Sequence, residues 1–418
     1  MKVAVVGGGS TYTPELADGF ARLRDQLRVD ELVLIDPDTV RLDIVGAFSA
    51  RLFARHGHPG RVGWTSDADA GLDGADVVLI QLRVGGQAAR ISDESFPLTF
   101  GCVGQETTGA GGLAKALRTV PVVLAIAEQA ARRAAPGAWI IDFTNPVGIV
   151  TRALLDAGHR AVGLCNVAIG LQRRMAAKLG VEPEAVVLDH VGLNHLTWET
   201  AVRLSGSDVL PKLLAEDGDA LAAEFETPLD LLLAQGLPSY YLRYFYAHDE
   251  MVEQQRTTPT RGQEVAAIES ELLALYADPA LDQKPELLGQ RGGAYYSEAA
   301  VGLLASLLGG SPGPHAANVR NGATLPFLDN NAVIEVTCDV DATGARPRRV
   351  NPLTPEQRGL IAHVSAYEEL AVDAALHGGR ERVARALLAH PLIGQYALAE
   401  ALTDRLLAAN SAHLAWAR

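Results

Sequence analysis

The stretch Lys2-Val-Ala-Val-Val6 runs directly into Gly7-Gly8-Gly9-Ser10-Thr11-Tyr12. A short apolar run that ends in glycines is typical of a buried parallel strand that turns tightly into a helix. Gly7 suits the tight turn, and Gly9 lets the backbone approach a pyrophosphate that a Cβ would block. Residues 14–23 are predicted to form the helix, whose N-terminal amides and dipole would face that anion. The stretch therefore predicts a nucleotide-binding turn, which includes Ser10.

The end of the second predicted strand supports this interpretation. Residues 31–35 form an apolar strand that delivers Asp36 to its C-terminal end. This carboxylate stands at roughly the 20-residue offset expected of the acid that binds the ribose of NAD. Tyr12 stands where the third glycine of a G-x-G-x-x-G pattern would fall, so a glycine-rich turn without a ligand remains an alternative. The strand context favours an NAD site built from Gly7, Gly9, Ser10 and Asp36.

The composition is that of a globular protein. The chain has 418 residues, 48% hydrophobic and 21% charged, and this length favours two domains. The net charge of −14 argues against nucleic acid or an anionic membrane as a partner. Uninterrupted apolar runs are shorter than the roughly 18 residues of a membrane span, and Met1-Lys2 leads straight into a strand, so no signal peptide is expected. Cysteines at 102, 165 and 338 do not make a disulfide framework, which favours a reducing cytoplasm.

Strands and helices alternate through the first part of the chain. Apolar runs and helical periodicity predict strands at 75–80, 138–142 and 160–164 and a long helix at 113–133. This alternation predicts an α/β fold with a Rossmann-type doubly wound parallel sheet, which forms an NAD-binding domain over residues 1–170. Such sheets bind ligands at the carboxyl ends of their strands. We therefore expect Gln81-Leu-Arg83, Asn145 and Cys165-Asn166 to converge there.

The pattern changes after residue 170. We expect an α+β domain over residues 171–418 that carries the substrate site. The predicted elements are strands at 186–190, 198–203 and 332–336 and helices at 263–276, 294–308, 357–376, 380–388 and 396–407. Its Ala- and Leu-rich helices are compatible with a homo-oligomer, either a dimer or a tetramer.

Cys165 and His195 are the candidate metal ligands. Cys165 follows a strand at the expected ligand-facing edge, and His195 lies in Gly192-Leu-Asn-His195 between two strands. A thiolate and an imidazole suit a borderline transition metal, although two protein ligands need help from substrate or water. Taken alone, either residue could instead be a buried structural residue.

Two charged residues are further candidates. Arg90 offers a planar fork for a phosphate or a carboxylate, but ion pairs with Asp93 and Glu94 on a solvated loop are the alternative. Glu106 lies in the glycine-rich stretch 104–112, which is either a binding loop or a flexible surface loop. In a binding loop, Glu106 could modulate an acid or a base.

The stretch 239–246 is dense in tyrosines for a chain with 6% aromatic residues. Core packing is the ordinary role of such a stretch. A tyrosine can also serve as a general base when a nearby cation lowers its pKa, and Arg243 and Arg261 are close in sequence.

Taken together, these blocks resemble glycoside hydrolase family 4, the NAD- and metal-dependent glycosidases. They occur in the family's order and span nearly the whole chain. The Cys-Asn and Gly-Leu-Asn-His blocks are the most specific. The matching blocks are Gly7-Gly-Gly-Ser-Thr-Tyr-Thr-Pro-Glu15, Arg83-Val-Gly-Gly86, Arg90 with Asp93-Glu94, Gly104-Gln-Glu-Thr-Thr-Gly109, Phe143-Thr-Asn-Pro146, Gly163-Leu-Cys-Asn166, Gly192-Leu-Asn-His195, Tyr241-Leu-Arg-Tyr244 and Asn321-Gly322.

The resemblance implies the main catalytic roles. Cys165 and His195 would bind a divalent metal, usually manganese in this family. Tyr241 would be the base, and Glu106 would tune it.

The resemblance also implies the substrate contacts. Arg90, Asn145 and Arg261 would hold the substrate, with Arg90 the best candidate for a sugar 6-phosphate. Asn166 resembles the 6-phospho-β-glucosidase branch, because members that act on α-linked phosphoglucosides carry Asp there. Val167-Ala168 departs from the Val-Pro usual in that branch, which leaves the exact substrate open.

The implied reaction is hydrolysis of a 6-phospho-β-glucoside through oxidation and elimination. NAD accepts hydride from C3 of the sugar, the metal polarises the ketone, and ionised Tyr241 removes the C2 proton. The aglycone leaves from C1, water adds, and NADH returns the hydride. This family is a known exception to the two-carboxylate rule of glycosidases.

Other functions remain open from the sequence. Within the family, unphosphorylated β-glucosides, α-galactosides or glucuronides are alternative substrates. An NAD-dependent 2-hydroxy acid dehydrogenase would share the nucleotide half but would not need Cys165. A non-catalytic nucleotide-sensing protein is the alternative from a different class.

Overall fold

The strands lie between residues 2 and 347 of the chain. The structure, a computed structural model, describes residues 1–293 and 295–417. Its strands are β1 (Lys2–Val6), β2 (Glu31–Ile35), β3 (Arg61–Thr65), β4 (Val77–Ile80), β5 (Trp139–Asp142), β6 (Ala161–Gly163), β7 (Val186–Leu193), β8 (Leu196–Leu204), β9 (Ser207–Asp208), β10 (Leu237–Pro238), β11 (Gly313–Arg320), β12 (Val333–Asp341) and β13 (Gly344–Pro347).

Helices connect these strands and also form the C-terminal part of the chain. They are α1 (Thr13–Arg22), α2 (Thr39–Arg55), α3 (Ala68–Leu72), α4 (Gly86–Ser95), α5 (Gly109–Arg133), α6 (Val147–Asp156), α7 (Val167–Leu179), α8 (Leu210–Glu224), α9 (Leu229–Gln235), α10 (Arg243–Tyr246), α11 (His248–Thr257), α12 (Arg261–Tyr276), α13 (Leu287–Gln290), α14 (Tyr296–Leu307), α15 (Pro355–His377), α16 (Arg380–Ala389) and α17 (Tyr396–Asn410).

Within the described residues, these strands form one sheet in the order β10-β8-β7-β12-β11-β6-β5-β4-β1-β2-β3, with β13 beside β12 and β9 beside β8. The strands from β3 to β6 are parallel, as expected of fully buried apolar runs such as β4. β11 joins this part to the rest of the sheet in antiparallel fashion, where Asn318 pairs with Gly163 of β6. The predicted class, a Rossmann-type sheet followed by an α+β part, is confirmed.

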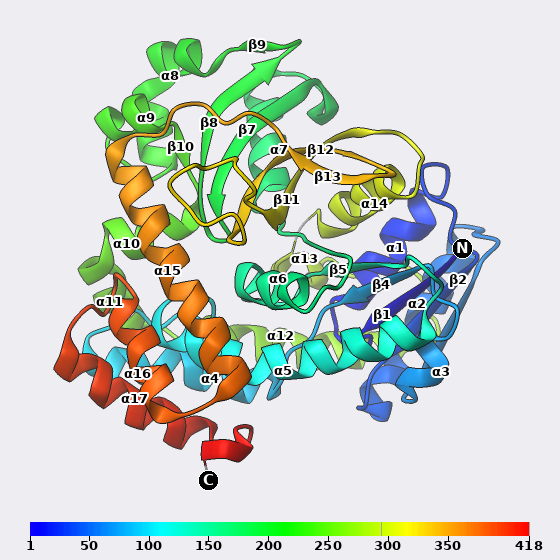
Figure 1. The fold of residues 1–418 in the computed structure, drawn as a ribbon. Coiled ribbons are helices and arrows are strands. Elements are labelled where there is room, and N and C mark those ends of the chain that lie inside the picture. The colour runs from blue at the N-terminus through cyan, green and yellow to red at the C-terminus, as the bar shows by residue number, and fades with distance from the viewer. Residues whose placement is uncertain (294, 418) are drawn as a thin grey trace.

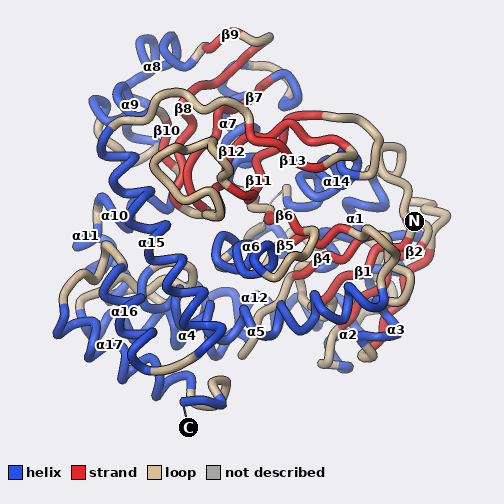
Figure 2. Tube along the Cα trace, in the orientation of Figure 1, coloured by secondary structure: helices blue, strands red, loops and turns tan. Residues whose placement is uncertain are grey.

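Figure 1 shows the two parts of the sheet, the parallel part near the N-terminus and the antiparallel part above it, in green to orange. Residue 170, the expected domain boundary, lies inside α7, and the sheet is continuous across it. Figure 2 shows helices on both sides of the parallel strands. On one side α1 packs against α2 and α14, and on the other α5 packs against α3, α6 and α15.

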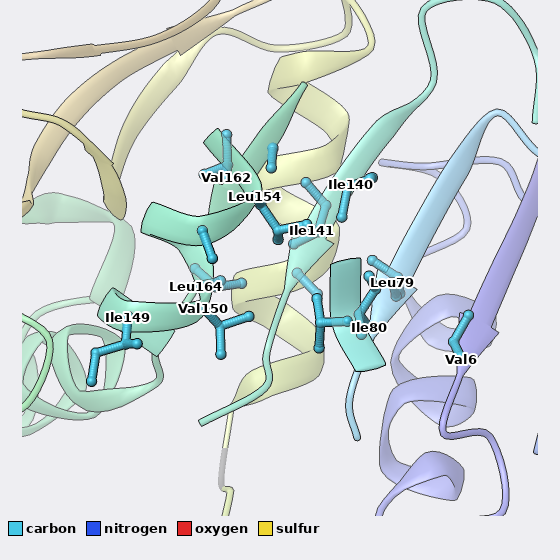
Figure 3. Packing of buried hydrophobic residues seen from close by; sticks show 14 of the residues in the cluster. Val6, Leu79, Ile80, Ile140, Ile141, Ile149, Val150, Leu154, Val162 and Leu164 are labelled. Atoms are coloured by element: carbon cyan, nitrogen blue, oxygen red, sulfur yellow. The ribbon is translucent and has the colours of Figure 1, made fainter. Parts of the chain in front are cut away.

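The core beneath the carboxyl ends of the parallel strands is apolar and fully buried. Figure 3 shows β4, β5 and α6 meeting through side chains such as Ile80, Ile141, Val150 and Leu154. Each of these side chains is fully buried, and each such burial stabilises the fold by about 1.5–3 kcal/mol. This packing fixes the positions of β4, β5 and β6, and therefore of the site residues that directly follow these strands.

Among the described residues, one helix, α5, is long and apolar enough to span a membrane by length and composition alone. Most of that helix is buried inside the fold, which is also a property of core helices in globular proteins.

Most predicted elements coincide with observed ones, and β2 has the predicted bounds. The helix expected at 294–308 appears as α14, although residue 294 lies outside the described residues, as does residue 418 at the end of the expected second domain. The sequence did not predict β3, a half-exposed edge strand, or β11, which begins Gly-Pro and lacks a regular apolar alternation.

Candidate active site

A cavity of about 1370 Å³ lies at the carboxyl ends of the parallel strands and extends to the antiparallel part of the structure. Its lining includes nearly all of the residues that the sequence singled out. These are Gly7, Gly9, Ser10, Asp36, Arg90, Glu106, Asn145, Asn166, His195, Tyr241 and Arg261. Cys165 lies just behind this surface, buried beside Asn166.

The glycine turn after β1 has the geometry of a close-approach site. Gly7 takes a φ of +88°, which favours glycine, and its amide donates to the carbonyl of Ile35 over 2.9 Å. The carboxylate of Asp36 accepts a 3.0 Å hydrogen bond from the amide of Gly9, and a Cβ on Gly9 would lie 2.9 Å from that carboxyl carbon. The turn and the acid at the end of β2 are therefore held together, as a dinucleotide site requires.

His195 occupies the turn between β7 and β8 in a strained backbone conformation. Its φ is +63°, which non-glycine residues adopt mainly where the surrounding structure imposes it, often at functional sites. Nδ1 lies 2.8 Å from the hydroxyl of Thr107, so Nε2 is the nitrogen through which the ring would coordinate a metal. Burial lowers the pKa of His195 to about 4, which keeps the imidazole neutral, the form that binds metals.

Cys165 follows β6 and is also buried. Burial raises the pKa of its thiol, whereas hydrogen bonds with the Asn194 side chain and with the backbone amides of Asn166 and Val167 favour the thiolate. A bound cation would act in the same direction as those hydrogen bonds. Within residues 1–293 and 295–417, no group of three or more His, Cys, Asp or Glu side chains is placed to hold a metal. A thiol and an imidazole fit a divalent metal whose other ligands come from substrate or water.

Tyr241 lies directly against His195. The two rings stack with their centroids 3.6 Å apart and an interplanar angle of 6°. Burial raises the pKa of the Tyr241 phenol well above its ordinary value, and Arg90 is the nearby cation that opposes this effect. Among the tyrosines of the dense stretch, Tyr240 is exposed and Tyr244 is buried.

Glu106 is buried in the same wall and is surrounded by cations. Lys115 donates to it over 2.6 Å, Nε of Arg90 lies 3.3 Å away, and Arg83 donates to it as well. Although burial alone raises its pKa, Arg83, Lys115 and Arg90 hold the pKa of Glu106 well below its usual range. Burial lowers the pKa of Lys115 to about 7.

The guanidinium of Arg90 is mostly buried and already paired, so it is less accessible to an anion than an exposed arginine would be. Its side chain is 12% exposed, and Nε also lies 2.7 Å from Glu94. The sequence left open that Arg90 forms ion pairs with Asp93 and Glu94. The pair with Glu94 exists, whereas Asp93 pairs with Arg118 instead. Arg90 still reaches the cavity lining, so both uses are compatible.

The other expected substrate contacts lie around the same cavity. Oδ1 of Asn145 is buried without a hydrogen-bond partner among the described residues, which suits an acceptor for a ligand hydroxyl. Arg261 starts α12, pairs with Glu264 over 2.9 Å and donates to the carbonyl of Gln290 over 2.6 Å.

Sequence reasoning missed several residues of this site. Lys115 lies within the apolar helix α5, where a lone lysine between alanines was the available signal. Arg291 joins Thr11 over 2.9 Å and Glu269 over 3.0 Å beside the glycine turn, although 280 residues separate Arg291 from Thr11. Nothing local in the sequence indicates that contact.

The fold and the site define a class of protein, a dinucleotide-binding α/β enzyme with an imidazole and a tyrosine in its cleft and a thiol buried behind them. The chain belongs to the family 4 glycosyl hydrolases, because it matches the sequence model of that family over residues 2–181 and that of its C-terminal domain over residues 190–393. The family resemblance predicted from the sequence is confirmed.

Similar proteins cover the chain from end to end. A probable 6-phospho-beta-glucosidase of Bacillus subtilis is 37% identical over 99% of this chain and 97% of the relative. The solved structure of the 6-phospho-beta glucosidase from Thermotoga maritima, with manganese, NAD+ and glucose-6-phosphate, superimposes with a TM-score of 0.91 at 31% identity and 99% coverage of both chains. Malate dehydrogenase from Salinibacter ruber shares the fold, with a TM-score of 0.52 at 17% identity over 90% of this chain and 97% of the other.

Proposed function

We propose that this protein hydrolyses 6-phospho-β-glucosides by the oxidation–elimination route, with NAD and a divalent metal, most favourably Mn²⁺. The observation that carries the proposal is the stacking of Tyr241 on His195 in the cavity that also contains the glycine turn, with Cys165 buried near Tyr241. The end-to-end similarity to 6-phospho-beta-glucosidases supports the choice of substrate.

The nucleotide part of the cavity would hold NAD. Gly7, Gly9 and Ser10 present backbone amides and a hydroxyl to the pyrophosphate, and Asp36 accepts hydrogen bonds from the ribose hydroxyls. Bound NAD and metal would supply hydride transfer at C3 and polarisation of the carbonyl formed there.

The chain's own residues carry the proton transfer and the positioning of the substrate. Tyr241 takes the proton from C2 at its phenol oxygen, with Arg90 as the cation that favours the phenolate. Cys165 and His195 would hold the metal, with further ligands from substrate or water. Glu106 keeps Arg90 and Lys115 in place, and through them tunes Tyr241.

The substrate itself would be held by Arg90, Asn145, Asn166 and Arg261. The orphaned Oδ1 of Asn145 accepts from a sugar hydroxyl, and Arg90 or Arg261 faces the 6-phosphate. Residues 1–170 would thus bind the dinucleotide, and residues 171–418 would supply His195, Tyr241 and Arg261.

We also propose a cytoplasmic homo-oligomer. Cys102, Cys165 and Cys338 are free and buried, as suits a reducing compartment. Large apolar side chains on α15 to α17, such as Leu376 and Tyr396, are exposed and would be covered in a dimer or tetramer. Light scattering of the purified protein would give the mass that tests this assembly.

The decisive experiment measures hydrolysis of para-nitrophenyl β-glucoside 6-phosphate in deuterated water, with and without NAD, Mn²⁺ and a thiol reductant. Activity that needs these additions, with deuterium at C2 of the product, is the expected result. If only the unphosphorylated or α-linked analogue is turned over, the mechanism stands but the substrate is a different glycoside of this family. NADH that accumulates from a hydroxy acid, with every glycoside inert, would contradict the proposal.

A further inference from the structure

A row of ionisable side chains is buried in the antiparallel part of the sheet, outside the cavity. His190 of β7 lies between Glu199 of β8, 2.7 Å from Nδ1, and Glu335 of β12, 2.9 Å from Nε2. The side chains are 0%, 0% and 2% exposed, in the order His190, Glu199 and Glu335. Buried charges of this kind are costly and need a reason beyond packing.

The central histidine of this row is charged. Burial alone lowers the pKa of His190. The neighbouring Glu199 and Glu335 outweigh this effect and raise the pKa to about 10, so the imidazole is charged. Hydrogen bonds and the charge of His190 hold the pKa of Glu335 below its usual range against the effect of burial. The imidazolium of His190 and the carboxylate of Glu335 therefore form a buried ion pair, 2.9 Å apart.

Glu335 extends this row toward both candidate metal ligands. Its Oε2 accepts a 2.8 Å hydrogen bond from Asn194, which precedes His195 in the strained turn. The Asn194 side chain is also close enough to Cys165 to lower the pKa of its thiol, against the larger effect of burial, which raises it. Oε2 accepts a second hydrogen bond, over 2.9 Å, from Asn318, the residue that pairs with Gly163 at the end of β6.

We propose that Glu335 is a positioning residue for the metal centre and acts through Asn194 to fix Cys165 and the turn of His195. This inference rests on the proposed function, which supplies the metal. It assigns a purpose to the buried row: partners of metal ligands orient those ligands and commonly change metal affinity when they are removed. The alternative is that Glu335 only satisfies neighbouring polar groups in the sheet.

The test compares Glu335→Gln and Asn194→Ser with a matched control, Thr337→Val. Thr337 lies on β12 as well, and its hydroxyl donates to the carbonyl of Leu188 and accepts from the amide of His190, without contact to Asn194. Free Mn²⁺ is titrated by electron paramagnetic resonance with NAD⁺ and glucose 6-phosphate present. Co²⁺ is added separately, and its thiolate charge-transfer absorption reports the bond to Cys165. Thermal unfolding without metal measures fold stability.

We expect Glu335→Gln and Asn194→Ser to weaken Mn²⁺ binding by about 10- to 100-fold and to shift or weaken the cobalt–thiolate band. Thr337→Val should lower the unfolding temperature without either change. Unchanged Mn²⁺ affinity and band in Asn194→Ser, which leaves the buried row intact, would overturn the inference. The inference would also be overturned if Mn²⁺ affinity falls in proportion to the unfolding temperature in every variant, in Thr337→Val as much as in Glu335→Gln.

A further variant separates this inference from the proposed function. If the cobalt–thiolate band persists in Cys165→Ser, the ligand assignment fails and the inference fails with it. If Cys165→Ser abolishes the band while Glu335→Gln and Asn194→Ser bind metal as the unsubstituted protein does, the proposed metal site stands and Glu335 is only structural.

Discussion

Replacing Glu106 by Gln should have a cost in stability that depends on pH. Glu106 is buried and contacts Arg83, Arg90 and Lys115, whose side chains are 25%, 12% and 4% exposed. Removing one partner of a buried ion pair typically costs about 3–5 kcal/mol, because the other charge stays buried without compensation. Lys115 limits that cost, since it can release its proton.

The pH dependence follows from Lys115. With Glu106 present, burial lowers the pKa of Lys115 to about 7 in the folded state, and without Glu106 the pKa falls further. As the pH drops below 7, Lys115 gains its proton in the unsubstituted protein but not in the variant, so the variant loses relative stability. At pH 6, one unit below that pKa, the added cost is up to about 1.4 kcal/mol, and above pH 8 it vanishes. Glu106 itself stays ionised over this range.

Urea unfolding of Glu106→Gln at pH 6 and pH 8 measures both effects. The matched control is Glu264→Gln, because Glu264 pairs with Arg261 but is 48% exposed, so its loss should cost less than about 1 kcal/mol at either pH. We expect a cost of about 3 kcal/mol at pH 8 and a larger one at pH 6. A Glu106→Gln midpoint shift equal to that of the control, or one that is smaller at pH 6 than at pH 8, would refute this account of the cluster.

Three further predictions concern single side chains. Asp36→Ser should weaken NAD binding by about 10- to 100-fold and reduce the preference for NAD over NADP, as measured by fluorescence titration, because a charged hydrogen bond to the ribose is lost. Tyr241→Phe should lower kcat by roughly 10²- to 10⁴-fold and abolish deuterium exchange at C2, while unchanged exchange would identify another base. Burial raises the pKa of Glu368 to about 8, so the folded state keeps a proton that the unfolded chain loses above its ordinary value of 4.5, and stability falls between these pH values. Glu368→Gln should therefore stabilise the fold more at pH 8 than at pH 5, by about 1 kcal/mol or more in urea unfolding, and an equal effect at both pH values would contradict this.

The sequence was sufficient for the nucleotide half because its signals are local. A buried run, a glycine turn and Asp36 lie within one βαβ unit. The rule that ligand-binding residues follow the carboxyl ends of parallel strands places Asn145 and Asn166 at the same cavity. Tyr241 was a different case, because the family resemblance and not its aromatic neighbours distinguished it from Tyr240 and Tyr244.

The remaining features depend on contacts between distant segments. β11 has no regular apolar alternation, and its place beside β6 comes from pairing between residues 318 and 163. Lys115 and Glu335 appear in the sequence as single charges in apolar surroundings, a pattern that does not reveal their partners. Burial alone would make either charge costly, so their partners had to exist, but only the three-dimensional structure could identify them.

The join between the two parts of the sheet explains why the site contains a thiol and an imidazole from distant segments. Cys165 leaves β6, on the parallel side, and His195 leaves the turn between β7 and β8, on the antiparallel side, with β11 and β12 between these strands. Asn318 on β11 and Asn194 in the turn both donate to Glu335 on β12, so one carboxylate links the two sides of the join. The glycine turn and Asp36 follow β1 and β2, both in the parallel part. Under the proposed function, the strands that carry the dinucleotide site would therefore lie in one part of the sheet, whereas a metal held by Cys165 and His195 would depend on the correct joining of both parts.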